Sequence, residues 1–268
     1  MQVCWKRRRG LTRKRDQLTA QIREMPWVKI EKDYVFQTAE GKKTLAELFD
    51  GRSQLLVYHF MLGPGWGEGC PSCSFWADHF NGLTHHLPQR DVTFKVISRA
   101  ALKDIQKYQK RMGWSFDWVS SSESTFNLDL GVSSGKDDES PGISIFAREG
   151  DDVFHTYFTT GRGIEVLNST YGILDLVPKG RDEDKLEWPM AWVKRHDEYA
   201  KSKGNAVASG IRDSGHRSPG MRLARALNLV PVPWCLARWG VFPDPVSQTL
   251  AESWRTSPAK TLRHHDKC

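Results

Sequence analysis

The stretch Gln54-Leu55-Leu56-Val57-Tyr58-His59-Phe60-Met61-Leu62 leads through the glycine-rich segment 63–69 to Cys70-Pro71-Ser72-Cys73. Residues 55–62 are almost continuously apolar, which is typical of a central strand that is covered on both faces, as in a parallel sheet. Residues 74–87 read as a helix. The sequence therefore predicts a buried strand, a loop and a helix, with two cysteines where the helix starts.

A C-x-x-C pair at the start of a helix predicts a redox-active dithiol. With Cys70 at the N-cap, Pro71 takes the first helical position, where its missing amide costs nothing. The free amides of the first turn and the helix dipole favour the thiolate of Cys70, which is the nucleophilic form. Cys73, one turn further on, is expected to face inward and resolve the mixed disulfide. We therefore predict that Cys70 and Cys73 are catalytic.

Two other interpretations of the motif remain open. An isolated C-x-x-C is also half of many zinc sites, although such a site normally needs a second pair of ligands. The other cysteines (Cys4, Cys235 and Cys268) stand alone in the sequence. The two cysteines can also be ordinary thiols without a chemical role. We predict neither a metal site nor a cofactor.

The rest of residues 25–200 shows an α/β pattern with a mixed central sheet. Strands are predicted over 27–36, 54–62, 91–98, 118–120, 142–148 and 153–159. Helices are predicted over 11–24, 44–49, 74–87, 100–112 and 164–176. Beyond Ala200, Ser, Gly, Arg and Pro interrupt every periodic segment, which predicts a poorly ordered tail over 201–268.

The basic charge lies at the two ends of the chain. The net charge is +7, with eleven Lys or Arg against four Asp or Glu in 201–268, and eight against two in 1–24. Residues 25–200 are left at −6, which argues against a nucleic-acid-binding core. The sequence contains no run of about 18 apolar residues, so no membrane span is predicted. We expect neither nucleic acid nor a membrane as a partner.

The N-terminus shows no apolar stretch with a small-residue cleavage site, so we expect no secretory signal. Five cysteines without such a signal indicate cytosolic thiols rather than a disulfide scaffold. The arginines of 7–15 are also compatible with a mitochondrial presequence, but the first 24 residues contain no Ser. A cytoplasmic location is expected.

Residues 13–199 resemble the DUF899 proteins, a thioredoxin-like family related to the alkyl-hydroperoxide-reductase/thioredoxin group. The segments that carry the resemblance are Leu-Phe-Asp-Gly-Arg-Ser-Gln-Leu (48–55), Tyr-His-Phe-Met (58–61), Gly-Cys-Pro-Ser-Cys-Ser-Phe-Trp-Ala-Asp (69–78), Lys-Arg-Met-Gly-Trp-Ser-Phe (110–116), Val-Phe-His-Thr-Tyr (153–157) and Trp-Val-Lys-Arg-His-Asp-Glu-Tyr (192–199). The resemblance implies a thioredoxin-like fold and no particular reaction. The charge distribution and the change of composition after Ala200 divide the chain into three parts: a basic N-terminal helical extension (1–24), a thioredoxin-like domain (25–200) and the tail (201–268).

Several positions depart from thioredoxins and peroxiredoxins. In thioredoxins a Trp directly precedes the first Cys, whereas here Gly69 does so and Trp66 lies four positions before Cys70. Gly67 stands where peroxiredoxins carry a Ser or Thr, which weakens a peroxidase interpretation. Pro141 precedes a predicted strand, where a thioredoxin fold places its cis-proline, although a proline that simply ends a loop fits equally. We assign Trp66 and Pro141 to substrate binding.

His59 is the polar residue that interrupts the buried strand. Thioredoxins carry a buried Asp near this place as a proton acceptor for the inner cysteine, and the alignment puts Tyr58 or His59 there. Histidine is suited to proton transfer near neutral pH. We therefore count His59 among the candidate catalytic residues, beside the alternative of a hydrogen-bonded core histidine.

The first functional hypothesis is a thiol-disulfide oxidoreductase. It requires a thiol or disulfide substrate and an external electron donor. The second is a non-catalytic thioredoxin-fold module that uses the same groove to bind a protein or a metal partner. The substrate, the reduction potential and the oligomeric state are not encoded in these motifs.

Truncation after Ala200 tests the prediction for the tail. Prolines interrupt the apolar residues of 201–268, so this segment cannot offset an ordering cost of about 1–2 kcal/mol per residue. We expect the truncated and full-length chains to share the same melting temperature and the same rate of thiol alkylation. A clear loss of either would mean that the tail docks on the domain, with Trp234 and Trp239 the first contacts to examine.

Overall fold

Strand β4 (Gln54–His59) occupies the middle of the sheet, between the parallel strand β5 and the antiparallel strand β7. The structure is a computed structural model that describes residues 2–135 and 138–199. The predicted tail therefore lies outside the described residues. Because β4 has a neighbour on each side and a hydrophobic cluster on each face, its apolar run is buried as the sequence predicted.

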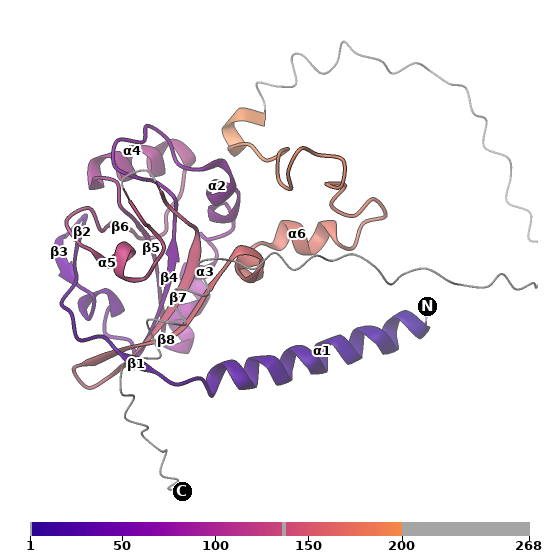
Figure 1. Ribbon diagram of the computed structural model, residues 1–268, viewed down its shortest axis with the longest axis horizontal. Helices are drawn as coiled ribbons and strands as arrows, with labels where there is room; N and C mark the ends of the chain where they lie inside the picture. The colour runs from indigo at the N-terminus through magenta and orange to yellow at the C-terminus, as the bar shows by residue number, and fades with distance from the viewer. Residues whose placement is uncertain (1, 136–137, 200–268) are drawn as a thin grey trace, which may run out of the picture. The chain divides into compact units, whose positions relative to one another are not determined.

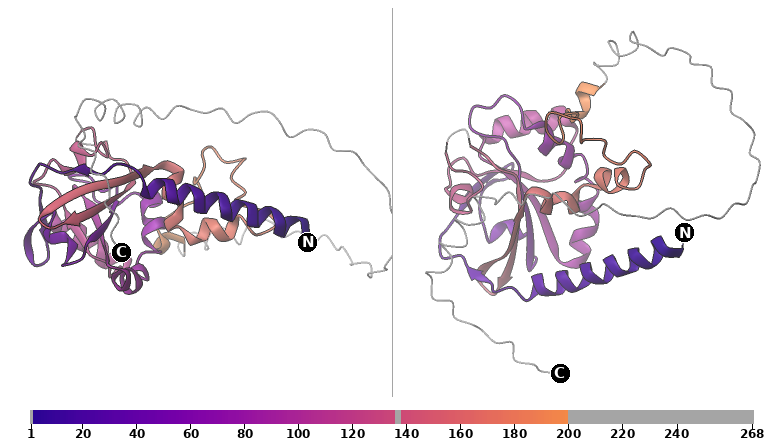
Figure 2. Two further views of the ribbon diagram at one scale, coloured as in Figure 1. Left: turned by 90° about the horizontal axis from the view of Figure 1, so that it is seen from below. Right: turned by 45° about the vertical axis from the view of Figure 1, so that its right-hand side comes forward.

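Within the described residues, eight strands form one mixed sheet in the order β1-β8-β7-β4-β5-β6-β2-β3, and Figures 1 and 2 show its twist. The remaining strands are β1 (Val28–Lys29), β2 (Val35–Thr38), β3 (Gly41–Thr44), β5 (Val92–Ser98), β6 (Trp118–Ser120), β7 (Gly142–Glu149) and β8 (Asp152–Thr160). Strands β4, β5 and β6 run parallel, and the other pairings are antiparallel.

Helical segments connect the parallel strands, as parallel pairing requires. The α-helices are α1 (Gln2–Arg23), α2 (Pro71–Ala77), α3 (Leu83–His86), α4 (Leu102–Met112), α5 (Phe126–Asp129) and α6 (Ser169–Leu174). The 3-10 helices are η1 (Glu47–Phe49), η2 (Leu87–Arg90), η3 (Gly161–Leu167) and η4 (His196–Glu198). Helix α2 begins the crossover from β4 to β5, and α4 forms the crossover from β5 to β6; Figure 1 shows these two helices near each other.

The two faces of β4 belong to different hydrophobic cores because its side chains alternate. Tyr58 joins the larger core, to which α2, α4 and α6 also contribute. Leu55 and Val57 join the smaller core, which contains residues of η1 and α5. Which face a residue of β4 occupies therefore decides whether it meets the helix with the two cysteines.

Two parallel β-α-β crossovers followed by an antiparallel hairpin and a helix make a thioredoxin-like fold. This confirms the predicted fold class of a mixed sheet flanked by helices. The domain boundaries at 24/25 and 200/201 stay predictions. None of the helices within residues 2–135 and 138–199 is both long and apolar enough to cross a membrane.

The helix predicted to run on to Leu87 is broken. Helix α2 ends at Ala77, and α3 and η2 follow only after a turn. Phe80 lies within this turn with its side chain fully buried, and Asn81 and Gly82 come next. Burial of Phe80 and the low helix propensity of Asn and Gly account for the break.

Two further predictions differ from the structure. The segment 27–36 does not form one strand, because β1 pairs with β8 at one edge of the sheet while β2 lies near the other edge. The predicted helix 164–176 is interrupted at Asn168. The side chain of Asn168 accepts a hydrogen bond from the Tyr171 amide (3.2 Å) and so starts a new helix, α6.

The loop before the cysteines is packed against the larger core at Gly69. A Cβ atom at this position would lie 2.6 Å from the Phe60 ring and 2.7 Å from the Tyr108 ring. Real side chains do not tolerate such distances, so only glycine lets the chain pass between the two rings. Two residues earlier, a Cβ atom on Gly67 would meet no atom of the described residues within 4 Å.

Gly69→Ala tests this close approach, with Gly67→Ala as the matched control in the same loop. Overpacking a well-filled core costs roughly 1–3 kcal/mol. We expect Gly69→Ala to lower the free energy of unfolding by about that amount and Gly67→Ala to leave it nearly unchanged, as measured by urea denaturation. Equal effects of the two substitutions would contradict the packing described.

Candidate functional site

Cys70 occupies the N-cap of α2, and Pro71 takes the first helical position. The Cys70 backbone is extended (φ −54°, ψ 131°), and its amide donates a hydrogen bond to the Met61 carbonyl (3.1 Å). That bond fixes the start of the helix against the segment that leaves β4. Cys70 is half-buried, Cys73 is buried, and both thiols are reduced.

The environment of Cys70 favours its thiolate. The pKa of Cys70 is lowered to about 6, and the hydrogen bond with the Cys73 thiol is the largest cause. Burial opposes this change, and the amides of Cys73 and Ser72 add to it. The Cys70 sulfur makes no N-cap hydrogen bond of strict geometry, so these amides act on it mainly as oriented dipoles.

The environment of Cys73 favours the protonated thiol instead. Burial and the neighbouring Cys70 sulfur raise its pKa well above the ordinary value. Two donors partly offset this rise, namely the Met61 amide and the Tyr58 hydroxyl. At neutral pH the pair therefore holds one proton, which Cys73 carries while Cys70 is charged.

Tyr58 lies fully buried in the same core as Cys73. Burial, and then the Cys73 sulfur, raise the pKa of Tyr58 well above 10, so its hydroxyl stays protonated and acts as a donor. This hydroxyl makes no strict hydrogen bond with any described residue. We take its approach to the soft sulfur as a polar contact that favours the Cys73 thiolate.

His59 points to the other face of the sheet. Its Nε2 lies 2.8 Å from the Ser144 hydroxyl, and its ring lies 5.8 Å from that of Phe126 in the smaller core. Burial, with a smaller contribution from His155, lowers the pKa of His59 to about 3, so the ring is neutral at physiological pH. The structure therefore does not bring His59 to the thiols, whereas it does bring its neighbour Tyr58.

Trp66 and Pro141 border the dithiol end of the sheet. Trp66 packs against the larger core and covers Gly63, where a Cβ atom would lie 2.9 Å from the indole. Pro141 directly precedes Gly142, which pairs with His59 near the end of β4. The Pro141 carbonyl accepts a hydrogen bond from Thr160 (2.6 Å), and among the described residues no peptide bond is cis. The assignment of both residues to substrate binding stays a prediction.

A hydrogen-bonded chain behind the cysteines was not predicted from the sequence. The Ser74 hydroxyl donates to the Cys70 carbonyl (2.8 Å) and lies 2.9 Å from the Tyr108 hydroxyl. Arg195 donates to Tyr108 (3.0 Å) and twice to the Gly69 carbonyl (3.1 and 2.7 Å). The peptide groups on both sides of Cys70 are thus held by side chains from α2 and from the far end of the domain.

Residues 192–198, which we call the C-terminal clasp, lie against α2 and α4. The Trp192 ring contacts Phe75 edge to face at 5.5 Å. His196 Nδ1 lies 2.7 Å from Asp78, and Asp197 binds Arg111 through two contacts of 2.8 and 3.1 Å. The motif Trp-Val-Lys-Arg-His-Asp-Glu-Tyr was visible in the sequence, but nothing in its composition indicated that it packs beside Cys70.

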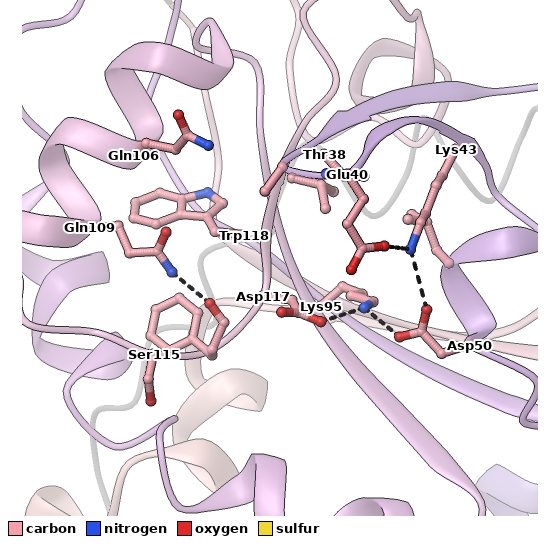
Figure 3. A pocket seen from close by; sticks show the side chains of 14 residues that line it. Thr38, Glu40, Lys43, Asp50, Lys95, Gln106, Gln109, Ser115, Asp117 and Trp118 are labelled. Atoms are coloured by element: carbon pink, nitrogen blue, oxygen red, sulfur yellow. Dashed lines mark hydrogen bonds and ion pairs between the residues drawn. The ribbon is translucent and has the colours of Figure 1, made fainter.

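A separate cavity of about 340 Å³ lies among β5, β6, η1, α4 and the β2–β3 turn, and neither cysteine lines it. Figure 3 shows Lys95 between Asp50 and Asp117. The Lys95 ammonium lies 2.5 Å from a carboxylate oxygen of each. Lys43 bridges Glu40 and Asp50 at 2.6 and 3.8 Å. Because these charges compensate one another, the network explains how a lysine is buried in β5.

Tyr58→Phe tests the contact between the hydroxyl and Cys73. Phe keeps the ring and removes only the donor, so we expect the pKa of Cys73 to rise further. Attack by Cys73 on a mixed disulfide at Cys70 should then slow several-fold at neutral pH, and its pH profile should move upward. The second release of thionitrobenzoate after reaction with 5,5′-dithiobis(2-nitrobenzoic acid) measures this step.

Tyr108→Phe is the control, because the Tyr108 hydroxyl faces Ser74 and Arg195 instead of Cys73. An equal slowing in both variants would contradict the assignment.

Solved structures similar to this chain are distant in sequence. PrxQ from Xylella fastidiosa, as a point mutant, is 17% identical with a TM-score of 0.39, over 52% of this chain and 89% of that chain. Peroxidoxin BcpB from Mycobacterium tuberculosis is 15% identical with a TM-score of 0.40, over 55% and 95%. Peroxiredoxin Q from Xanthomonas campestris is 14% identical with a TM-score of 0.37, over 52% and 90%. Likenesses at this level carry no conclusion about activity.

No curated protein matches the chain significantly. One family model does, and its description is a bacterial protein of unknown function, DUF899. The match covers residues 4–199, which include β4, the two cysteines, Pro141 and the C-terminal clasp. Since this is well over half of the 268 residues, the chain belongs to the DUF899 family.

Proposed function

We propose that this protein is a thiol-disulfide oxidoreductase in which Cys70 is the nucleophile and Cys73 the resolving thiol. The observation that supports this most directly is the contrast between two cysteines three residues apart. Cys70 is partly accessible and its pKa is lowered to about 6, whereas Cys73 is 1% exposed and its pKa is raised. A reactive thiol and a reserve thiol need these two environments.

The reaction has two exchange steps. The Cys70 thiolate attacks one sulfur of a substrate disulfide, an S–S bond forms between them, and the other substrate sulfur leaves as a thiolate. Cys73 then loses its proton and attacks Cys70, which releases the second substrate thiolate and leaves a Cys70–Cys73 disulfide. Two electrons pass to the substrate, and an external dithiol donor must return them for the next cycle.

The second step becomes easier once the first has occurred. In the mixed disulfide Cys70 carries no charge, so the repulsion that raises the pKa of Cys73 is relieved. The Met61 amide and the Tyr58 hydroxyl remain as donors for the Cys73 sulfur. Cys73 therefore loses its proton only after Cys70 has reacted with the substrate. Before that, Cys73 remains a protonated thiol and does not react with other compounds.

The lowered pKa of Cys70 also favours the reduced state of the protein. A thiol whose pKa falls from 9.0 to about 6 on folding contributes stability to the reduced form. This contribution is complete above pH 9 and is lost as the pH falls through 6. Because a stabilised reduced form makes a dithiol pair more oxidising, we expect a reduction potential above that of a pair with an ordinary thiol.

The substrate is a thiol or disulfide compound, and the electron donor is a second dithiol. We place this activity in the cytoplasm, where reducing systems keep both cysteines as thiols between cycles. The proposal requires no metal or other cofactor, since the exchange steps use sulfur atoms alone.

Alkylation of the reduced protein against pH tests the proposal, read at Cys70 by peptide mass. We expect the rate with iodoacetamide to rise through a midpoint near pH 6, since only the thiolate reacts. Cys73→Ala removes the main hydrogen-bond partner and should shift this midpoint upward. Cys73→Ser keeps a hydroxyl donor and should shift it less.

The same samples are equilibrated with mixtures of reduced and oxidised glutathione to obtain the reduction potential. A reversible Cys70–Cys73 bridge is the expected result. An ordinary midpoint near pH 9 together with no reversible bridge would sink the oxidoreductase proposal. Such a result would favour a binding module with the same fold.

A further inference from the structure

The Gly69 carbonyl lies just outside the hydrogen-bond pattern of α2. The first bond of that pattern runs from the Ser74 amide to the Cys70 carbonyl (3.0 Å), so the Gly69 carbonyl precedes the first acceptor of the helix. Gly69 is buried. A buried carbonyl needs a donor, because leaving it unpaired costs free energy comparable to a lost hydrogen bond.

Arg195 supplies donors to this carbonyl. Its Nε and Nη2 donate to the Gly69 oxygen at 3.1 and 2.7 Å, and Nε also donates to the Tyr108 hydroxyl at 3.0 Å. The Tyr108 hydroxyl lies 2.9 Å from the Ser74 hydroxyl, which in turn donates to the Cys70 carbonyl at 2.8 Å. One guanidinium is therefore connected to the peptide groups on both sides of Cys70.

The bond to Gly69 acts on Cys70 through the peptide between them. The Gly69 carbonyl and the Cys70 amide belong to one planar unit. Two donations from a charged guanidinium polarise this unit and strengthen its N–H as a donor, and that N–H binds the Met61 carbonyl at 3.1 Å. The Cys70 backbone is thus held at the same time by the C-terminal clasp and by the segment that leaves β4.

The loop before Cys70 does not fix this peptide by itself. Residues 63–69 contain four glycines, the residue type that loses most conformational freedom on folding. Packing between the Phe60 and Tyr108 rings determines where Gly69 lies. The guanidinium of Arg195 determines which way the Gly69 carbonyl points.

The state of the Cys70 thiol depends on this placement. Its pKa is lowered first by the hydrogen bond with the Cys73 thiol, and further by the amides of Cys73 and Ser72. Such hydrogen bonds weaken steeply when the distance or the angle changes. A Cys70 backbone that is free to adopt other angles would therefore lose part of the stabilisation of its thiolate.

From these contacts we propose that Arg195 is a positioning residue for the thiol exchange: its guanidinium fixes the Gly69–Cys70 peptide and so keeps the Cys70 sulfur at the first turn of α2, beside Cys73. This inference rests on the proposed function and adds to it a residue outside the C-x-x-C motif. Arginine suits the role because its planar fork serves several acceptors at once, which the single ammonium of lysine does not.

Arg195→Met tests the role, because Met keeps an unbranched apolar stem and removes every donor. The reduced protein is alkylated with iodoacetamide against pH and read at Cys70 by peptide mass. We expect the midpoint to rise by about one pH unit, as the loss of hydrogen bonding around a thiolate predicts. The rate at pH 5 should fall several-fold, and the rate at pH 9 should not fall, since Cys70 is then ionised in both proteins. Arg195→Lys should lie between the two.

The equilibrium with reduced and oxidised glutathione gives a second readout. If the pKa of Cys70 is one unit higher, the reduced form loses stability at pH 7, where the wild-type thiol is mostly ionised. The equilibrium of Arg195→Met should therefore shift about fivefold toward the Cys70–Cys73 disulfide. An arginine that served only the stability of the fold would not move this equilibrium in step with the alkylation midpoint.

Arg111→Met is the matched control. Like Arg195, Arg111 binds the carboxylates of Glu68 and Glu198. It also binds Asp197, and within the described part of the chain its hydrogen bonds go to carboxylates only. This variant should keep the wild-type midpoint and the wild-type glutathione equilibrium. An equal change in both variants would assign the effect to the ion pairs and overturn the proposal.

The possible failures are distinguishable. A wild-type midpoint near pH 6 that Arg195→Met leaves unchanged would overturn the positioning role and leave the oxidoreductase proposal intact. A wild-type midpoint near pH 9 with no reversible bridge would overturn the proposed function and this inference with it. Labelling of Cys73, which is buried, reports whether the domain stays folded. If Arg195→Met exposes Cys73, Arg195→Lys decides in its place, and an unchanged midpoint then overturns the proposal.

Discussion

The backbone of Met61, just after β4, is the point at which the sheet holds the dithiol. Its carbonyl accepts the hydrogen bond of the Cys70 amide, and its own amide is directed at the Cys73 sulfur. The position of Met61 depends on β4, whose two neighbours and two buried faces leave it little freedom. Strand burial, helix start and thiol chemistry are therefore linked through the backbone of one residue.

The Gly69 carbonyl provides a second attachment on the side away from the sheet. Two donations from Arg195 hold it, and Arg195 is in turn paired with Glu68 and Glu198, each at 3.0 Å. Exposed ion pairs contribute little to stability, but the Arg195 side chain is only 14% exposed and its guanidinium also bonds a carbonyl. The loop before Cys70 thus gains from Arg195 an order that glycine-rich sequences do not have on their own.

The sequence predicted the strands, turns and helix starts that have a local pattern. It left open which side chains of a buried strand lie on which face of the sheet. The apolar run of β4, the turn between β7 and β8 and the cysteines at the helix start were all readable, because each has a local signature. Whether Tyr58 or His59 meets Cys73 depends on which face of β4 carries α2, and a run apolar on both faces does not encode this. The break after Ala77 was missed for a related reason, since burial of Phe80 is a tertiary effect that overrides helical spacing. The contact of Arg195 with Gly69 joins residues 126 positions apart, and no short motif predicts such a pairing.

That separation also sets an order of events during synthesis. At about 5–20 residues per second, a ribosome needs roughly 6–25 s to extend the chain from Gly69 to Arg195. Throughout this interval the two cysteines have already been made, while the side chain that completes their surroundings has not. The nascent thiols therefore meet the redox buffer of the cell before the finished domain governs their reactivity, and any early oxidation has to be reversed after release.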